Sequence, residues 1–151
     1  MRELRTILLA EDNPKDVELT LEALSDYNLA NEVVAVPDGE AALDYLRCRG
    51  AYANRPPHSP ALILLDLKMP KVDGLEVLKE IKSDENLRVI PVVMLSSSRE
   101  ERDLLVSYGL GVNAYVVKPV KFHDFIEAVK ALGLFWAFFN EPPRRLTNDR
   151  S

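Results

Sequence analysis

Acidic side chains follow two apolar runs of the sequence, at the points where those runs end. Asp66 directly follows the run 61–65, and Glu11 and Asp12 directly follow the run 6–10. Short, continuous apolar runs bounded by turn residues are typical of strands buried on both faces of a parallel sheet. Carboxylate oxygens are ligands that Mg²⁺ prefers in proteins. The three acids therefore predict a divalent metal site at the carboxyl ends of two strands, where open parallel sheets bind their ligands.

Two further apolar runs end in side chains that could contact a phosphoryl group. The run 91–95 is followed by Ser96, and the run 114–117 is followed by Lys118 and Pro119. A hydroxyl can donate a hydrogen bond to a phosphoryl oxygen, and a lysine ammonium is a compact cation. Three acids, one hydroxyl and one lysine at four strand ends together suit a divalent metal and a phosphoryl group.

These strands alternate with segments that have helical spacing of apolar residues. Asn13 followed by Pro14 is a favoured helix start, and Asp73 with Glu76 three residues later resembles a capping box. Residues 32–36 are predicted as one more strand. The alternation predicts an α/β fold in which five strands form a parallel, doubly wound sheet with helices on both faces.

Length, charge and composition narrow the class of protein. The chain has 151 residues, of which 47% are hydrophobic, and a net charge of −5 without a basic stripe. We expect one domain over residues 1–141, a flexible polar tail over residues 142–151, and no nucleic-acid partner. The single cysteine, Cys48, excludes an internal disulfide and fits a reducing cytoplasm. We expect neither a signal peptide nor a membrane span.

Taken together, the motifs resemble the receiver domain of two-component response regulators, over roughly residues 5 to 133. Each motif is weak alone, but the set in this order is specific. It consists of Glu11-Asp12, Asp66-x-x-Met69-Pro70-x-x-Asp73-Gly74, Leu95-Ser96 and Tyr115-x-x-Lys118-Pro119. The resemblance implies a flavodoxin-like sheet with strand order 2-1-3-4-5.

The resemblance also implies roles for the acidic residues. Asp66 is expected to be the phosphoryl acceptor, in a reaction that requires Mg²⁺. Asp12 and Asp66 are expected to bind the metal directly and Glu11 through water, and the backbone carbonyl of Lys68 is a further expected ligand. In the family, side chains at the positions of Lys68 and Ser98 tune how fast the phosphoryl group is lost to water.

Three residues are implied in binding the phosphoryl group and in signalling. Lys118 is expected to contact one phosphoryl oxygen, and its bond to Pro119 is expected to be cis, which aims the lysine inward. Ser96 is expected to donate a hydrogen bond to another oxygen. Tyr115 is the expected switch aromatic, whose ring turns inward when Ser96 moves. The alternative for Tyr115 is an ordinary half-buried strand tyrosine.

Within the family, the chain looks like the stand-alone regulators that serve bacterial phytochromes. The long proline-rich loop over residues 49–60, the expected lack of an output domain and the aromatic ending over residues 135–143 support this narrower resemblance. It implies a phytochrome-type sensor histidine kinase as the partner.

The end of the last helix carries more apolar residues than one helix face can bury. Phe135, Trp136, Phe138 and Phe139 follow a core-facing stripe and extend the last helix with an almost uniformly apolar surface. We expect a two-fold homodimer that uses these residues together with the fourth and fifth helices. The alternative is that the helix ends early and the chain folds back over its own sheet.

The sequence therefore predicts a cytoplasmic, stand-alone response regulator that signals by a conformational switch after phosphorylation of Asp66. It assists phosphotransfer and its own dephosphorylation but is not a metabolic enzyme. One alternative is a Mg²⁺-dependent phosphatase of the haloacid-dehalogenase type, although those usually carry a second acid where this chain has Lys68. Another alternative is a receiver-shaped dimerisation scaffold without phosphorylation, which would have no need for the acid cluster.

Overall fold

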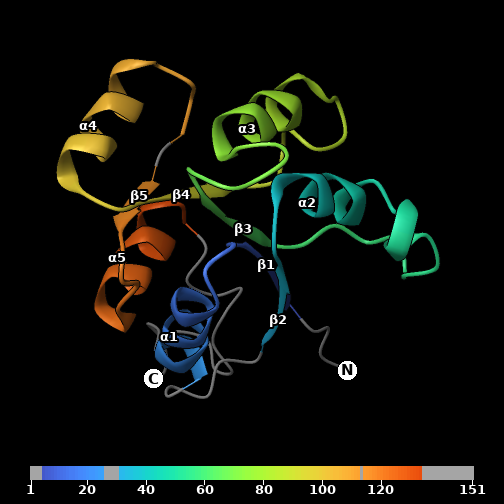
Figure 1. Cartoon of the computed structure of the whole chain (residues 1–151), viewed down its shortest axis with the longest axis horizontal. Coiled ribbons are helices and arrows are strands. Elements are labelled where there is room, and N and C mark those ends of the chain that lie inside the picture. Colours follow the sequence, from blue (N-terminus) through green and yellow to red (C-terminus); the bar gives the residue numbers. More distant parts are fainter. Residues whose placement is uncertain (1–4, 26–30, 113, 134–151) are drawn as a thin grey trace, which may run out of the picture.

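A five-stranded parallel sheet forms the centre of the molecule, shown in Figure 1. The computed structural model describes residues 5–25, 31–112 and 114–133. The strands are β1 (Arg5–Ala10), β2 (Asn31–Val36), β3 (Leu62–Asp66), β4 (Val92–Ser96) and β5 (Ala114–Val117). All pairings are parallel and the order is β2-β1-β3-β4-β5, which confirms the predicted fold class.

Helices cover both faces of the sheet. They are α1 (Pro14–Ser25), α2 (Gly39–Leu46), α3 (Gly74–Ser83), α4 (Arg99–Ser107) and α5 (Phe122–Ala131). In Figure 1, α1 and α5 lie on one side of the sheet, and α2, α3 and α4 lie on the other. None of the helices in the described part of the chain is long and apolar enough to cross a membrane.

The continuous apolar runs fill two separate cores, one on each face of the sheet. Successive strand side chains point to opposite faces. Accordingly, Ile63 and Leu65 of β3 pack in the core under α2 and α3, while Leu62 and Leu64 pack in the core under α1 and α5. All five residues of β3 are buried, so the acid that ends this strand is held at the edge of a rigid element.

The predicted helix starts are present. The side chain of Asn13 accepts hydrogen bonds from the backbone N–H groups of Lys15 and Asp16, at 2.9 and 3.3 Å. The side chain of Asp73 accepts one from the N–H of Glu76 at 2.9 Å. These caps satisfy backbone donors that have no partner inside the helix, and they fix where α1 and α3 begin relative to the preceding strands.

The proline-rich segment between α2 and β3 differs from the predicted loop in one respect. It contains a short 3₁₀ helix, η1 (Gly50–Tyr52). Its anchor is Arg55, whose Nε donates to the carbonyl of Tyr45 at 2.7 Å and whose guanidinium lies 4.0 Å from the centre of the Tyr45 ring. A cation over an aromatic face is a favourable contact, so the segment is tied to the end of α2.

The described part of α5 ends at Ala131. Gly133 has a φ of +73°, a left-handed conformation that commonly follows a helix end, and its N–H donates to the carbonyl of Lys130 at 3.0 Å. The predicted core stripe is present, with Phe125 and Val129 fully buried. The expected extension with its aromatic residues and the expected tail lie outside the described residues.

Candidate functional site

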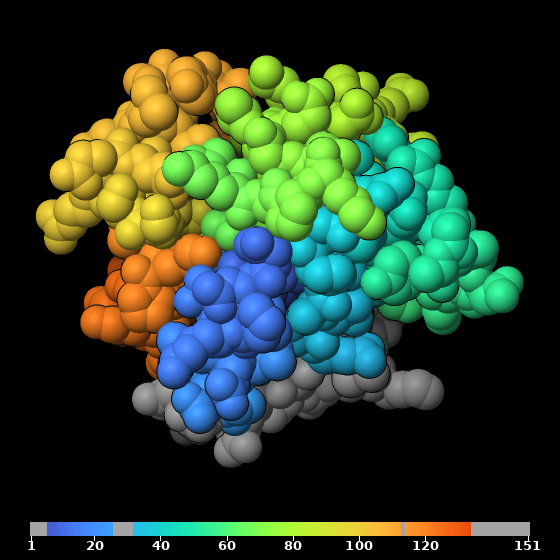
Figure 2. Space-filling view, in the orientation of Figure 1, coloured from blue at the N-terminus to red at the C-terminus, as the bar shows by residue number. Residues whose placement is uncertain are grey.

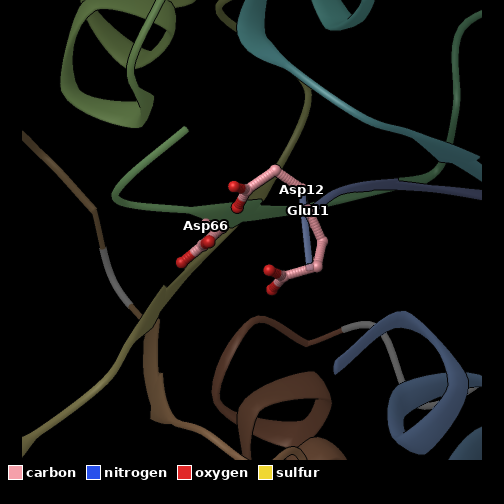
Figure 3. Close-up of side chains that lie close together, drawn as sticks. All are labelled: Glu11, Asp12 and Asp66. Carbon is pink, nitrogen blue, oxygen red and sulfur yellow. The ribbon is translucent and has the colours of Figure 1, made fainter. Parts of the chain in front are cut away.

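Three carboxylates from two neighbouring strands lie together at the carboxyl edge of the sheet. Glu11 and Asp12 directly follow β1, and Asp66 ends β3, which pairs with β1 so that Ala10 lies opposite Leu65. Each acid offers an oxygen atom, and these atoms lie within 4.8 Å of one another. Figure 3 shows the three side chains close together. The structure thus brings the three predicted acids into one cluster.

Burial of this cluster makes its negative charge costly. Glu11 and Asp66 are buried, whereas Asp12 is exposed. Burial of the Asp66 carboxylate, followed by the nearby charge of Glu11, raises the pKa of Asp66 to about 7, although Lys118 opposes part of this rise. A divalent cation would relieve the repulsion, and hard oxygen ligands with one solvent-facing side suit an ion that keeps several waters. The residues therefore fit a divalent metal ion.

Lys118 lies among these acids. Its Nζ is 3.1 Å from Glu11 Oε1, 3.2 Å from Asp66 Oδ2 and 3.1 Å from Asp16 Oδ2. Burial alone would lower the pKa of Lys118, but Asp16, Asp66 and Glu11 together raise it above its usual range. The peptide bond between Lys118 and Pro119 is cis. Lys118 is thus a fixed cation at the side of Asp66.

Asp16 is a site residue that the sequence analysis missed. It lies in the first turn of α1, and its carboxylate reaches Lys118 from a position 102 residues away in the sequence. The sequence carried no local signal for this role, because an acid in the first turn of a helix has the same pattern whether or not it reaches a distant lysine. Figure 2 shows the blue segment that contains α1 adjoining the orange segment of β5 and α5 on one face of the molecule.

Ser96 is at the end of β4 but its hydroxyl is engaged within its own loop. The residue is fully buried, and its Oγ donates to the backbone carbonyl of Ser98 at 3.2 Å. Asp66 lies opposite Leu95 in the pairing of β3 and β4, so Ser96 is one residue beyond the acid. Contact with a phosphoryl group on Asp66 would require this hydroxyl to leave the Ser98 carbonyl.

An ion pair joins the loop after β3 to the first turn of α4. Lys68 Nζ lies 3.3 Å from Glu101 Oε2, and Glu101 Oε1 accepts a hydrogen bond from the N–H of Ser97 at 2.7 Å. Burial would raise the pKa of Glu101, but the bonds from Ser97 and Lys68 hold it below its usual value. Ser98 caps α4 by accepting from the N–H of Glu101 at 3.1 Å. The Glu101 carboxylate thus binds the residue before the cap, where a capping box would bind the cap itself.

Tyr115 is half-buried in β5 and packs against the core on the α2 and α3 face. Burial raises the pKa of its hydroxyl. Tyr115 also lines a groove of about 400 Å³ between α4, β5 and α5, together with Arg99, Arg102, Asp124 and Glu127. Tyr115 therefore lies between the interior and a surface groove. A change of its rotamer would alter the shape of that groove.

We expect Mg²⁺ affinity to depend steeply on pH near neutrality. With the pKa of Asp66 raised to about 7, the metal-free site is deprotonated near pH 8 and binds a proton near pH 6. Because the metal must then displace this proton, affinity should fall about tenfold between these two values. Isothermal titration calorimetry checks this, with Asp66→Asn as the control that should lose the steep dependence. Equal affinity of the wild type at both pH values would contradict it.

Comparison with known proteins agrees with this geometry. Residues 7–130 match the model of the response regulator receiver domain. Response regulator Rcp1 of Synechocystis sp. (strain ATCC 27184 / PCC 6803 / Kazusa) is 42% identical over 132 residues, which are 87% of this chain and 88% of that protein. A solved structure of Rcp1 is of its Mn²⁺-bound form, with a TM-score of 0.69 over 87% of this chain and 94% of that chain.

Two other solved structures are similar over most of the chain. The bacteriophytochrome response regulator AtBRR is 64% identical with a TM-score of 0.88, covering 93% of this chain and 100% of that one. The phosphorylated cyanobacterial phytochrome response regulator RcpA is 47% identical with a TM-score of 0.71, and the match covers 89% of this chain and 95% of that one. The chain belongs to the response regulator receiver domain family.

Proposed function

We propose that this protein is a response regulator that accepts a phosphoryl group onto Asp66 in a reaction that requires Mg²⁺. The observation that carries the proposal is the position of the Asp66 carboxylate, buried at a strand end within 4.8 Å of the oxygens of Glu11 and Asp12 and 3.2 Å from Lys118 Nζ. Phosphoryl transfer needs positioning and charge neutralisation more than other chemistry, and this site supplies both.

In the proposed reaction, an Asp66 oxygen forms a bond to phosphorus while the bond from phosphorus to a donor imidazole nitrogen breaks. Asp12 and Asp66 would hold Mg²⁺ directly, Glu11 through water and Lys68 through its backbone carbonyl. When bound, the ion supplies positive charge that offsets the negative charge of the acids and the phosphoryl group. Lys118 contacts one phosphoryl oxygen, which its raised pKa supports because the ammonium stays charged.

The proposed signal is a conformational switch in the loop after β4. The Ser96 hydroxyl leaves the carbonyl of Ser98, to which it is bonded at 3.2 Å, and donates to a phosphoryl oxygen. The Tyr115 ring then turns inward from its groove, which shifts the population between two packings. Loss of the phosphoryl group to water is assisted by the same site, with Lys68 and Ser98 at its edge.

The proposed donor is a phytochrome-type sensor histidine kinase. The names of AtBRR and RcpA support this, because both are phytochrome response regulators and are similar over most of the chain. The proposed location of this protein is the cytoplasm, because a histidine kinase that donates the phosphoryl group takes it from ATP. Residues 1–141 would form the receiver, and residues 142–151 a flexible tail.

We further propose a homodimer through α4 and α5. Leu104 and Tyr108 support it, because they are apolar side chains at the α4 surface with 53% and 50% of their area exposed. Their four-residue spacing places them on one side of the helix. Phe135, Trp136, Phe138 and Phe139 would extend this interface.

Intact-mass spectrometry of the protein mixed with Mg²⁺ and acetyl phosphate tests the proposed function. A phosphoryl adduct that requires Mg²⁺ and is absent from Asp66→Asn is expected. If neither acetyl phosphate nor a phosphohistidine kinase labels the wild type, a dimerisation scaffold becomes the better description. Membership of the receiver family argues against the alternative of a haloacid-dehalogenase-type phosphatase. Release of phosphate in many rapid turnovers would favour that phosphatase instead.

A further inference from the structure

Asp16 is a fourth carboxylate near the site and lies outside the cluster that fits a metal. The cluster consists of Glu11, Asp12 and Asp66. Asp16 instead approaches Lys118 from the first turn of α1, with Oδ2 3.1 Å from Nζ. The two side chains are 24% and 15% exposed, so the ion pair is mostly withdrawn from solvent. Such a pair is stronger and less screened than one on the surface.

An acid in the first turn of a helix usually serves the helix itself, by capping or by its favourable position at the helix N-terminus. In α1, other side chains accept the hydrogen bonds of the N-terminal backbone N–H groups. Asn13 accepts the N–H groups of Lys15 and Asp16, and the N–H of Asn13 donates to Glu11 Oε2 at 3.2 Å. A capping-box acid at the position of Asp16 would have accepted that last bond. The Asp16 carboxylate is therefore available for Lys118.

The other two partners of Lys118 would also be drawn to a metal. Glu11 and Asp66 both belong to the cluster, and both lie close to Lys118 Nζ, at 3.1 and 3.2 Å. A divalent cation among the acids would compete with the ammonium for these oxygens. Asp16 is outside the cluster, so its bond to Lys118 can persist when the metal is present.

We propose that Asp16 is a positioning residue that holds Lys118 beside Asp66 when a divalent cation engages the acid cluster. This inference rests on the proposed function, in which Lys118 contacts a phosphoryl oxygen. Asp16 accepts a hydrogen bond from the ammonium group of Lys118, from the side of α1. This bond keeps Nζ close to Asp66 and prevents it from turning toward solvent. The bond joins α1, the helix that follows the acid pair, to the residue that directly follows β5.

The test compares the rate of adduct formation with acetyl phosphate and excess Mg²⁺ in the wild type and in Asp16→Asn. The variant should form the adduct about tenfold more slowly, because a misplaced charged group costs transition-state stabilisation. Its Mg²⁺ affinity should stay within about twofold of the wild type, because Asp16 does not bind the metal. Asp16→Glu should restore part of the rate. Glu18→Gln, which removes an exposed acid of the same helix, is the matched control and should change neither quantity.

A second readout reports on Lys118 directly. In the Mg²⁺-loaded wild type, the ¹⁵N ammonium signal of Lys118, assigned by its loss in Lys118→Met, should be retained, and it should broaden or disappear in Asp16→Asn. A wild-type rate in Asp16→Asn, or a loss of rate explained by weaker Mg²⁺ binding, would overturn the inference while leaving the proposed function in place. If the wild type forms no adduct, the proposed function fails, and an unchanged ammonium signal in Asp16→Asn would then also exclude the positioning role.

Discussion

Lys118→Met should lower the free energy of unfolding of the metal-free protein by about 3 kcal/mol near pH 8, because removing one partner of a buried ion pair leaves the other charges uncompensated. Lys118 Nζ lies within 3.2 Å of oxygens from Glu11, Asp16 and Asp66, and its side chain is only 15% exposed. Methionine keeps an unbranched side chain, one atom shorter than that of lysine, and removes the charge. Urea unfolding followed by circular dichroism measures the loss.

The loss of stability caused by Lys118→Met should be smaller under two conditions. Near pH 6 Asp66 is largely protonated, since its pKa is raised to about 7, so less charge is left uncompensated. Excess Mg²⁺ should also restore much of the stability, since a cation bound to the folded state stabilises it. Lys121→Met, which removes an exposed lysine at the start of α5, should change stability by no more than about 0.5 kcal/mol.

A double-mutant cycle assigns the effect of Lys118 to its partner. If the loss comes from the uncompensated charge of Asp66, then Lys118→Met should be less destabilising in an Asp66→Asn background, with a coupling energy of about 1 kcal/mol or more. Equal losses in both backgrounds would show that the loss comes from Glu11, from Asp16 or from packing, and that Asp66 does not cause it.

Gly74→Ala should destabilise the protein by about 3 kcal/mol or more, because the added methyl group meets backbone atoms that cannot move aside. A Cβ at this position would lie 2.0 Å from the carbonyl oxygen of Asp66 and 2.8 Å from the Cα of Leu67. The Gly74 N–H also donates to the Leu67 carbonyl at 2.7 Å. The first residue of α3 is thus packed directly on the end of the strand that carries Asp66.

The matched control is Gly109→Ala. Gly109 has a φ of +61°, and a Cβ at this position would meet no atom within 4 Å, so the substitution adds backbone strain without a clash. It should cost about 1 kcal/mol. Thermal and urea unfolding of both variants measure the difference. A Gly74→Ala variant as stable as Gly109→Ala would show that the loop after β3 can move, and that α3 does not hold the end of the Asp66 strand in place.

Much of the fold and of the acid cluster could be predicted because buried parallel strands are continuous apolar runs in the sequence. The runs ending at Glu11 and Asp66 become neighbouring strands, with Ala10 opposite Leu65, so their acids must meet at one edge of the sheet. Helix caps such as Asn13 also act locally, and the structure contains them. The strand order came from the family resemblance, since alternation alone does not specify it.

The parts that could not be predicted depend on where long side chains end in space. Asp16 had the pattern of a helix first-turn acid, and only the fold brings Lys118 within 3.1 Å of it. Glu101 had the spacing of a capping box, but its carboxylate binds Ser97 and Lys68. The ion pairs Asp16–Lys118 and Lys68–Glu101 join segments that are separate in the sequence, and no local pattern encodes such a pairing.

The central claim is that Asp66 itself carries the phosphoryl group, and chemical trapping of the acyl phosphate tests it most directly. Borohydride reduces an acyl phosphate to an alcohol, so a phosphorylated aspartate is converted to homoserine and releases phosphate. After reaction with Mg²⁺ and acetyl phosphate, reduction and peptide mapping by tandem mass spectrometry should find homoserine at position 66, and aspartate at that position when Mg²⁺ is left out. Homoserine at another acid such as Asp12, with position 66 unchanged, would contradict the account.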